Sequence, residues 1–383
     1  MKERVQQSSE HKRQGARTAG SGRRRGARSD AQQRNEAQRP DEQRPRSRRE
    51  RQNGWLIALF IILPIVFVIG TICIGRFSVS IADVFAAIRQ SLTGEHLVTD
   101  AVFAVVMNNR LQRALQGLLV GAALAASGAC FQGLFRNPLV SSGMLGVSNG
   151  AAFGAALAIL LFGNMVMTSL FSFFFGIIAV VCAYFVGRVS GASPTITLVL
   201  GGVIVQSIFQ ALVSLLKYLA DPENELPAIT YWHMGSLAHT SLRELQLASI
   251  PMLIGIVGML LFRWRLNVLA MGDREAKTLG LDVAVNKGLV IAFATMATAA
   301  AISISGVIGW IGLVVPHICR MLIGSDNRRL IPASLSIGGC FLILVDTICR
   351  TLTGAEIPLG IVMALVGGPF FIYLLKKTKG KSW

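Results

Sequence analysis

The C-terminal Gly380-Lys381-Ser382 comes closest to a catalytic motif in its residue types. A Gly-Lys-Ser sequence that ends a glycine-rich loop and opens a helix binds nucleotide phosphates. The first glycine of that loop would fall at position 375, which is Leu375, and only Trp383 follows the serine. We therefore predict that the chain has no ATP site of its own and takes its energy from another protein.

The other candidates for chemistry lie in long apolar runs. His317 is alone in Val-Val-Pro-His-Ile-Cys-Arg, where a buried core histidine is the simpler interpretation than a ligand or base. Asp346 and Arg350 are four apart, which predicts an ion pair near a membrane end. The six cysteines show no C-x-x-C pair and no His partner at ligand spacing, which predicts core residues rather than disulfides or zinc ligands. We predict no catalytic residue, metal or cofactor.

A polar segment, Met271 to Val283, separates two long apolar runs and reads M-G-D-R-E-A-K-T-L-G-L-D-V. Ala276 and Leu279 are three apart, so a short helix would place them on one face, with Gly280 just past its end. Asp273 could cap the start of that helix. From spacing alone, an ordinary connecting loop is the favoured interpretation.

The elements that position these residues are apolar runs in a chain that is 52% hydrophobic and only 15% charged. Runs long enough to cross a bilayer predict an all-α polytopic membrane protein with both ends on the same side. Glycines and Pro316 interrupt the stretch 305–324, where one helix could break into pieces. The ten predicted spans are 55–74, 111–135, 144–162, 165–187, 195–216, 247–262, 289–308, 310–324, 331–349 and 357–375.

The distribution of Lys and Arg predicts the orientation of these spans. Residues 1–53 contain 16 Lys and Arg against 7 Asp and Glu and few apolar side chains, which predicts a disordered basic tail ahead of a transmembrane domain at 54–383. Such a tail more plausibly touches anionic lipid than nucleic acid. With ten spans, 30 of the 37 basic residues lie inside, both termini are cytoplasmic, and so is the loop near 271–288.

Gly272 to Leu281 resembles the coupling loop of the FecCD-type permeases, the membrane subunits of iron-siderophore and cobalamin ABC importers. The resemblance continues through most of residues 55 to 376, with Gln112 standing where the family usually has proline. The segments that carry it are Arg110-Leu111-Gln112-Arg113, Gln132 to Leu139, Gly143 to Ala151, Gly309 to His317, Asp346 to Arg350, Glu356 to Gly360 and Gly368 to Phe371.

The resemblance implies the fold of a type II ABC importer permease in a bacterial inner membrane, working by alternating access. Its partners would be two ATPase subunits, an extracytoplasmic binding protein and a second permease copy or paralogue, and its cargo an iron(III)-siderophore, with haem or cobalamin as alternatives. The implied ATPase-coupling residues are Gly272, Asp273, Glu275, Ala276, Leu279 and Gly280. The implied docking residues are Arg110, Arg113 and Arg350, and the implied cytoplasmic gate is Thr195 and Ile196, where Ile replaces a small polar residue.

Two other readings stay open at the level of sequence. An ion-coupled secondary transporter would also be polytopic and lack a P-loop, but it usually needs ionisable residues near the membrane midplane. Asp346 and Glu356 fall near the outer edge instead. For the three arginines, the spacing alone favours side chains that reach the lipid headgroups rather than a docking site.

Overall fold

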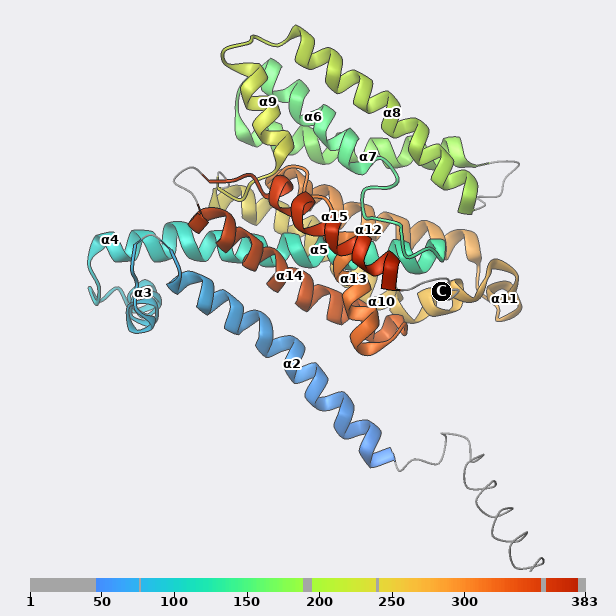
Figure 1. Cartoon of the computed structure of the whole chain (residues 1–383), viewed down its shortest axis with the longest axis horizontal. Helices are drawn as coiled ribbons and strands as arrows, with labels where there is room; N and C mark the ends of the chain where they lie inside the picture. The colour runs from blue at the N-terminus through green and yellow to red at the C-terminus, as the bar shows by residue number, and fades with distance from the viewer. Residues whose placement is uncertain (1–45, 76, 189–194, 239–240, 353–355, 378–383) are drawn as a thin grey trace, which may run out of the picture. The chain divides into compact units, whose positions relative to one another are not determined.

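The computed structural model describes residues 46–75, 77–188, 195–238, 241–352 and 356–377 (Figure 1). The regular structure in these ranges is helical, as the sequence predicted. Most of the predicted tail (1–45) and the Gly380-Lys381-Ser382 sequence lie outside the described residues. The chain divides into two units, Met1–Ala58 and Leu59–Trp383. Helix α2 (Arg46–Cys73) supplies the described part of the first unit, and it begins well before Trp55, where the first span was predicted to start.

Each predicted span overlaps one helix of the structure, and 289–308 extends past the helix end at Ser305. Six stretches are long and apolar enough to cross a membrane, and four shorter apolar helices accompany them in the described residues. The chain is therefore a multi-pass membrane protein. Besides α2, the apolar helices are α5 (Leu111–Phe135), α6 (Val147–Phe162), α7 (Met165–Gly187), α8 (Thr195–Leu219), α10 (Leu242–Met271), α12 (Val283–Ser305), α13 (Ile311–Ile323), α14 (Asn327–Leu352) and α15 (Leu359–Lys377).

Several short elements were not expected from the apolar runs. Helix α3 (Ile81–Thr93) starts with a capping box, in which the Ser80 hydroxyl accepts from the Asp83 amide and the Asp83 carboxylate accepts from the Ser80 amide. After α3, α4 (Asp100–Phe103) and a π-helical stretch, η2 (Ala104–Arg110), lead into α5. Helix α9 (Glu225–Met234) lies in a predicted loop, whereas α11 (Asp273–Thr278) is the short helix predicted within 271–283. Hydropathy averaged over a span length cannot detect such short elements.

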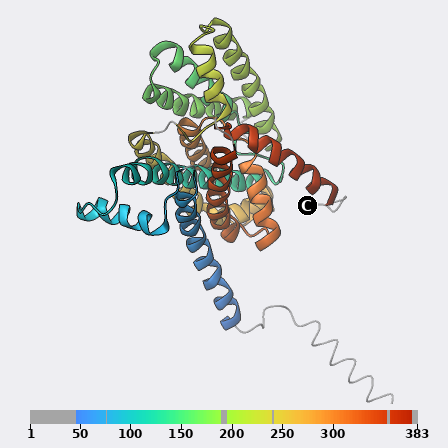
Figure 2. The same ribbon diagram turned by 60° about the vertical axis from the view of Figure 1, so that its left-hand side comes forward.

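Helix α5 forms the centre of the second unit and is largely buried. It packs against α10, α12, α13 and α14, whereas α6, α7 and α8 pack mainly against one another. Helix α12 contacts both groups. Figures 1 and 2 show α6 to α8 together on one side of α5. Helix α11 and the α3–α4 segment lie at opposite ends of α5 (Figure 1); we call these the α11 end, predicted to be cytoplasmic, and the α3 end, predicted to be extracytoplasmic.

Small residues allow α5 to approach its neighbours closely. A Cβ atom added at Gly121 would collide with the carbonyl oxygen of Gly338 on α14. One added at Gly128 would collide with the carbonyl of Gly312 on α13. Gly154 of α6 lies equally close to the carbonyl of Phe171 on α7. Membrane helices gain stability from such contacts because lipid supplies no hydrophobic force to pull them together.

The predicted break near 305–324 is present and has a local cause. Gly306, at φ +67°, ends α12, and α13 begins only at Ile311. A residue with a side chain rarely adopts this left-handed conformation, so glycine is suited to the position. Pro316 lies inside α13 and does not end it.

Candidate functional site

Helix α11 is fixed at its C-terminus by two hydrogen bonds of a Schellman motif. The Leu281 amide donates to the Ala276 carbonyl and the Gly280 amide donates to the Lys277 carbonyl, both at 3.0 Å. Gly280 has φ +79°, which is the left-handed conformation that this motif requires. The prediction of a short helix that ends just before Gly280 is therefore confirmed.

The start of α11 differs from the prediction. Gly272, rather than Asp273, occupies the N-cap position, and it makes no side-chain capping bond. The Asp273 carboxylate instead pairs with the ammonium of Lys287 on α12 at 2.7 Å. The Lys287 side chain is only 6% exposed, so this ion pair ties the loop to the helix that follows. The Glu275 carboxylate folds back over the backbone of Gly272.

The two apolar side chains of this segment differ in burial, which their spacing does not indicate. Ala276 is completely buried in the permease core, whereas Leu279 is 60% exposed. The Leu279 amide still donates to the Glu275 carbonyl at 3.2 Å, as in a helix, so the difference is that other parts of the described chain cover Ala276 and leave Leu279 open. Met271 and Val285 are also more than half exposed. Leu279, Met271 and Val285 form an exposed apolar set at the α11 end, and sequence reasoning identified only the first of them.

Nearby, the turn between α13 and α14 is held to α10. The Asn267 side-chain amide donates to the Asp326 carboxylate at 2.6 Å, and the Asn267 oxygen accepts from the Asn327 amide at 2.8 Å. Burial alone would raise the pKa of Asp326, but the hydrogen bonds from Asn267 and from the Arg328 amide, with the charges of Arg328 and Arg329, hold that pKa below its usual value. Polar contacts therefore hold both helices that flank α11, α10 through Asn267 and α12 through Lys287.

At the α3 end, the three predicted docking arginines line one small space together with the carboxylate of Asp346. Arg113 of α5 donates to both oxygens of Asp346 on α14, at 2.8 to 3.0 Å, and its remaining nitrogen donates to both oxygens of Glu356 at 2.9 Å. Bidentate pairs of this kind are strong and directional. The Arg113 and Asp346 side chains are only 10% and 6% exposed, whereas Glu356 is 34% exposed.

The other two arginines bond mainly to backbone. Arg350 donates to the Thr71 carbonyl at 2.6 Å and to the Thr71 hydroxyl at 2.8 Å. Its predicted ion pair with Asp346 is present, but at 3.9 Å the nitrogen and oxygen are too far apart for a hydrogen bond. Arg110 donates to the carbonyls of Ile72 and Phe77, so it joins the end of α2 to the chain that leads into α3.

These contacts bury the three arginines, which the sequence had predicted to be exposed. Arg110 as a residue is 6% exposed and the Arg350 side chain 12%. The spacing placed Arg110 and Arg113 together correctly, but it could not identify Asp346 as the partner of Arg113, since 233 residues separate them. We call Arg110, Arg113, Asp346, Arg350 and Glu356 the arginine cluster. A role in docking stays a prediction.

The predicted gate residues stand at the start of α8. Thr195 is the first residue of that helix, and Ile196 is 74% exposed. The preceding residues, 189–194, lie outside the described part of the chain. The two residues therefore lie at the N-terminal end of α8.

Residues 61–377 match the FecCD transport family. The chain is 40% identical to the molybdate import system permease protein MolB of Haemophilus influenzae, over 85% of this chain and 96% of that protein. It is 37% identical to a probable iron chelatin transport system permease protein of Helicobacter pylori, over 72% and 83%. Permease proteins named for cobalamin and hemin import match as well.

A solved structure of a metal-chelate type ABC transporter in an inward-facing conformation is similar over nearly its full length. The TM-score is 0.76 at 36% identity, and the match covers 85% of this chain and 99% of that chain. The chain belongs to the FecCD transport family and is a multi-pass permease subunit of an ABC importer.

Proposed function

We propose that this permease carries an iron(III)-siderophore complex into the cytoplasm by alternating access, with haem or cobalamin as the alternative cargoes. It works with two separate ATPase subunits, a second permease copy or paralogue, and an extracytoplasmic binding protein. Support comes from the family match and from a relative named for iron chelatin. Because another relative is named for molybdate, the cargo has to be decided by transport measurements.

The observation that carries the ATPase-coupling role is the combination of a rigid loop and exposed apolar side chains. The loop is fixed by the Schellman motif and by the Asp273–Lys287 ion pair. Leu279, Met271 and Val285 project from this fixed frame without being buried by the permease itself. Apolar side chains on a rigid support suit a cleft in a partner, since little conformational entropy is lost when they bind. Thr195 and Ile196 would gate the path at the same end.

Uptake by the reconstituted complex tests the cargo. The permease, its ATPase and its binding protein are placed in vesicles, and uptake of labelled ferric siderophore, haem, cobalamin and molybdate is compared with and without ATP. We expect vanadate-sensitive uptake of the ferric siderophore. Uptake of only one of the other three would identify a different cargo, and uptake driven by a proton or sodium gradient without ATP would favour the secondary transporter.

The structure disfavours an ion-coupled mechanism in one respect. Asp346 and Glu356, the acidic residues considered for such a role, are both already bonded to Arg113. A coupling carboxylate has to bind and release an ion during the cycle, and a permanent arginine partner opposes this. The two residues therefore suit a structural or docking role better.

For docking, we propose that the binding protein places acidic residues against the rim of the arginine cluster. Glu356 is its most exposed carboxylate, and it occupies one edge of the Arg113 guanidinium. A carboxylate of the binding protein would compete with Glu356 for that edge. Several such pairs acting together orient the partner and speed encounter more than they add affinity.

A further inference from the structure

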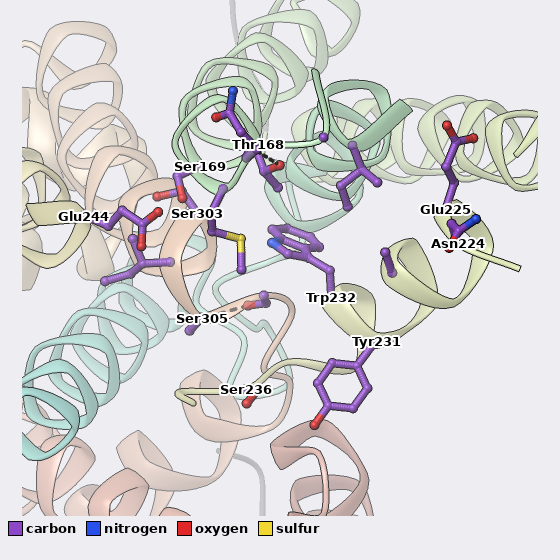
Figure 3. A pocket seen from close by; sticks show the side chains of 17 residues that line it. Thr168, Ser169, Asn224, Glu225, Tyr231, Trp232, Ser236, Glu244, Ser303 and Ser305 are labelled. Carbon is purple, nitrogen blue, oxygen red and sulfur yellow. Dashed lines mark hydrogen bonds between the residues drawn. The ribbon is translucent and has the colours of Figure 1, made fainter. Parts of the chain in front are cut away.

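A cavity of about 480 Å³ lies at the α3 end between the start of α7, α9, the start of α10 and the end of α12 (Figure 3). Its wall is rich in hydroxyl groups and also includes the indole ring of Trp232. The Glu244 side chain lies in this wall beside Ser169 and Ser303 (Figure 3). None of the predicted coupling, docking or gate residues lines it.

A second chamber of about 250 Å³ adjoins the first and is almost entirely apolar. It lies between α7 and α10, with Phe173, Phe174 and Pro251 in its wall. Four residues line both spaces, so the polar cavity and the apolar chamber meet along a shared wall. These residues are Ser169, Glu244, Ser303 and Ile304.

Glu244 is the charged group at that shared wall. Its residue is 6% exposed, and one carboxylate oxygen, Oε2, accepts from the Ser241 amide at 2.9 Å in the capping box of α10. In the part of the chain that the structure describes, no cation lies within ion-pair distance of this carboxylate. An uncompensated carboxylate in such a place costs free energy, so a cationic partner would be favoured there.

The hydroxyl groups of the polar cavity also favour a ligand that donates hydrogen bonds. Thr168, Ser303 and Ser305 donate their hydroxyl protons to backbone carbonyls of their own helices or, for Thr168, to Asn164 just ahead of α7. Each hydroxyl oxygen then has only lone pairs left to offer to the cavity. These three hydroxyl oxygens can therefore only accept from a ligand in the cavity, and they suit a ligand that donates hydrogen bonds.

Along α10, the polar cavity comes first and the apolar chamber follows, which is the order of headgroup and acyl chain in a lipid. Glu244 lies in the first turn of α10 and Pro251 lies seven residues deeper, which is about 10 Å along a helix. The polar cavity is at the end of the span, where headgroups lie, and the apolar chamber is at hydrocarbon depth. Leu170, Phe174 and Leu247 line the chamber and are 44%, 52% and 54% exposed, so the chamber is open at these side chains.

We propose that these two spaces bind a phospholipid with a primary ammonium headgroup, such as phosphatidylethanolamine. The ammonium donates to the Glu244 carboxylate and to the hydroxyl oxygens, and an acyl chain fills the chamber between α7 and α10. A quaternary ammonium has a similar charge but no N–H donor, so phosphatidylcholine binds less well.

Lipid retention by the full-length permease tests this proposal. The protein is purified from membranes that contain equal amounts of phosphatidylethanolamine and phosphatidylcholine, stripped to its last bound lipids, and measured by native mass spectrometry. We expect the ethanolamine lipid to be retained roughly tenfold or more over the choline lipid, as for one charge-assisted hydrogen bond. Glu244→Gln should remove this preference while the helix remains capped, since glutamine also serves in a capping box.

Glu225→Gln is the matched control, because Glu225 lines the same cavity but its carboxylate accepts from the Asp221 amide and lies away from the chamber. It should leave the preference intact. Equal retention of the two lipids by the unaltered protein, or an unchanged preference in Glu244→Gln, would overturn the proposal. So would displacement of the lipid by free phosphoethanolamine, because a headgroup without chains would then occupy the site equally well.

Discussion

Arg113 connects two helices and a loop through charge, and its burial determines what its removal does. Both of its terminal nitrogens and its Nε atom donate to carboxylates, and Asp346 is almost completely enclosed. A buried carboxylate that loses its partner is left with the full cost of desolvation. Substitutions here therefore act on the stability of the permease before they act on any partner.

We predict that Arg113→Met lowers the free energy of unfolding by about 3–5 kcal/mol, measured by denaturation in detergent. Adding Asp346→Asn to it should recover a large part of the loss, because the unpaired charge is then gone. Arg89→Met is the control, since its pair with Glu95 is at 3.6 Å with both side chains at least 60% exposed. It should change the free energy by at most about 1 kcal/mol. Equal effects of the two substitutions would contradict the assignment.

Glu356→Gln tests the proposed docking role. If acidic residues of the binding protein compete with Glu356 for Arg113, removing its charge should tighten docking several-fold in low salt, measured by surface binding to permease in nanodiscs. If Glu356 only supports the fold, docking should stay unchanged. Weaker docking of the variant would mean that Glu356 itself contacts the partner.

The sequence identified part of this residue-scale arrangement. The Asp346–Arg350 pair could be predicted because both residues lie on one helix turn, four positions apart. The closer Arg113–Asp346 pair could not, because it depends on how α5 packs against α14. Likewise, Ala276 and Leu279 have the spacing of one helix face, but only the structure shows that Ala276 is buried and Leu279 is exposed.

At the scale of elements, the α11 segment presents few side chains to a partner. We predict that Leu279→Glu weakens ATPase association or stimulation while the permease still inserts and stays folded, because a charged group replaces an exposed apolar contact. Co-purification and ATP hydrolysis by the assembled complex measure both effects. Ala276→Asp should instead lower the yield of folded permease, since Ala276 is inside the core. Normal assembly and hydrolysis in Leu279→Glu would remove the basis for the coupling role.

The crossing of α5 and α14 depends on glycines at the contact. We predict that Gly121→Ala lowers the free energy of unfolding by about 1–3 kcal/mol, because the new methyl group has no room beside the Gly338 carbonyl. Gly288→Ala is a matched control on α12, where an added Cβ meets nothing within 4 Å. That control should be neutral or slightly stabilising, since alanine is the better helix former. Denaturation of both variants in the same detergent makes the comparison.

Apolar length predicted the long helices well because a spanning segment must be continuous and hydrophobic. The structure adds that α6 and α13 are short, and that the glycine at 306 separates α12 from α13. Helices α3 and α9 were missed because each is short and partly polar. Their positions depend on packing at the α3 end, which leaves little trace in averaged hydropathy.

At the scale of the whole molecule, the basic residues before the first span are separate from everything that carries the family match, which begins at residue 61. Deleting residues 2–45 removes 12 of the 16 Lys and Arg that precede Trp55 but keeps Arg46, Arg48, Arg49 and Arg51. Four arginines next to a single apolar helix are enough to favour one orientation. We therefore predict that the shortened chain inserts correctly and keeps most of its uptake activity, with a modest loss of correctly oriented protein.

The measurement compares uptake per inserted molecule for the shortened and full-length chains, with insertion checked by labelling single cysteines at the two ends of the bundle. Replacing the deleted segment with an uncharged linker of equal length is the control, because it separates length from charge. If uptake is lost while insertion stays normal, the segment has a specific role in transport. If orientation reverses in both shortened and linker variants, the remaining arginines are too few to orient the first span.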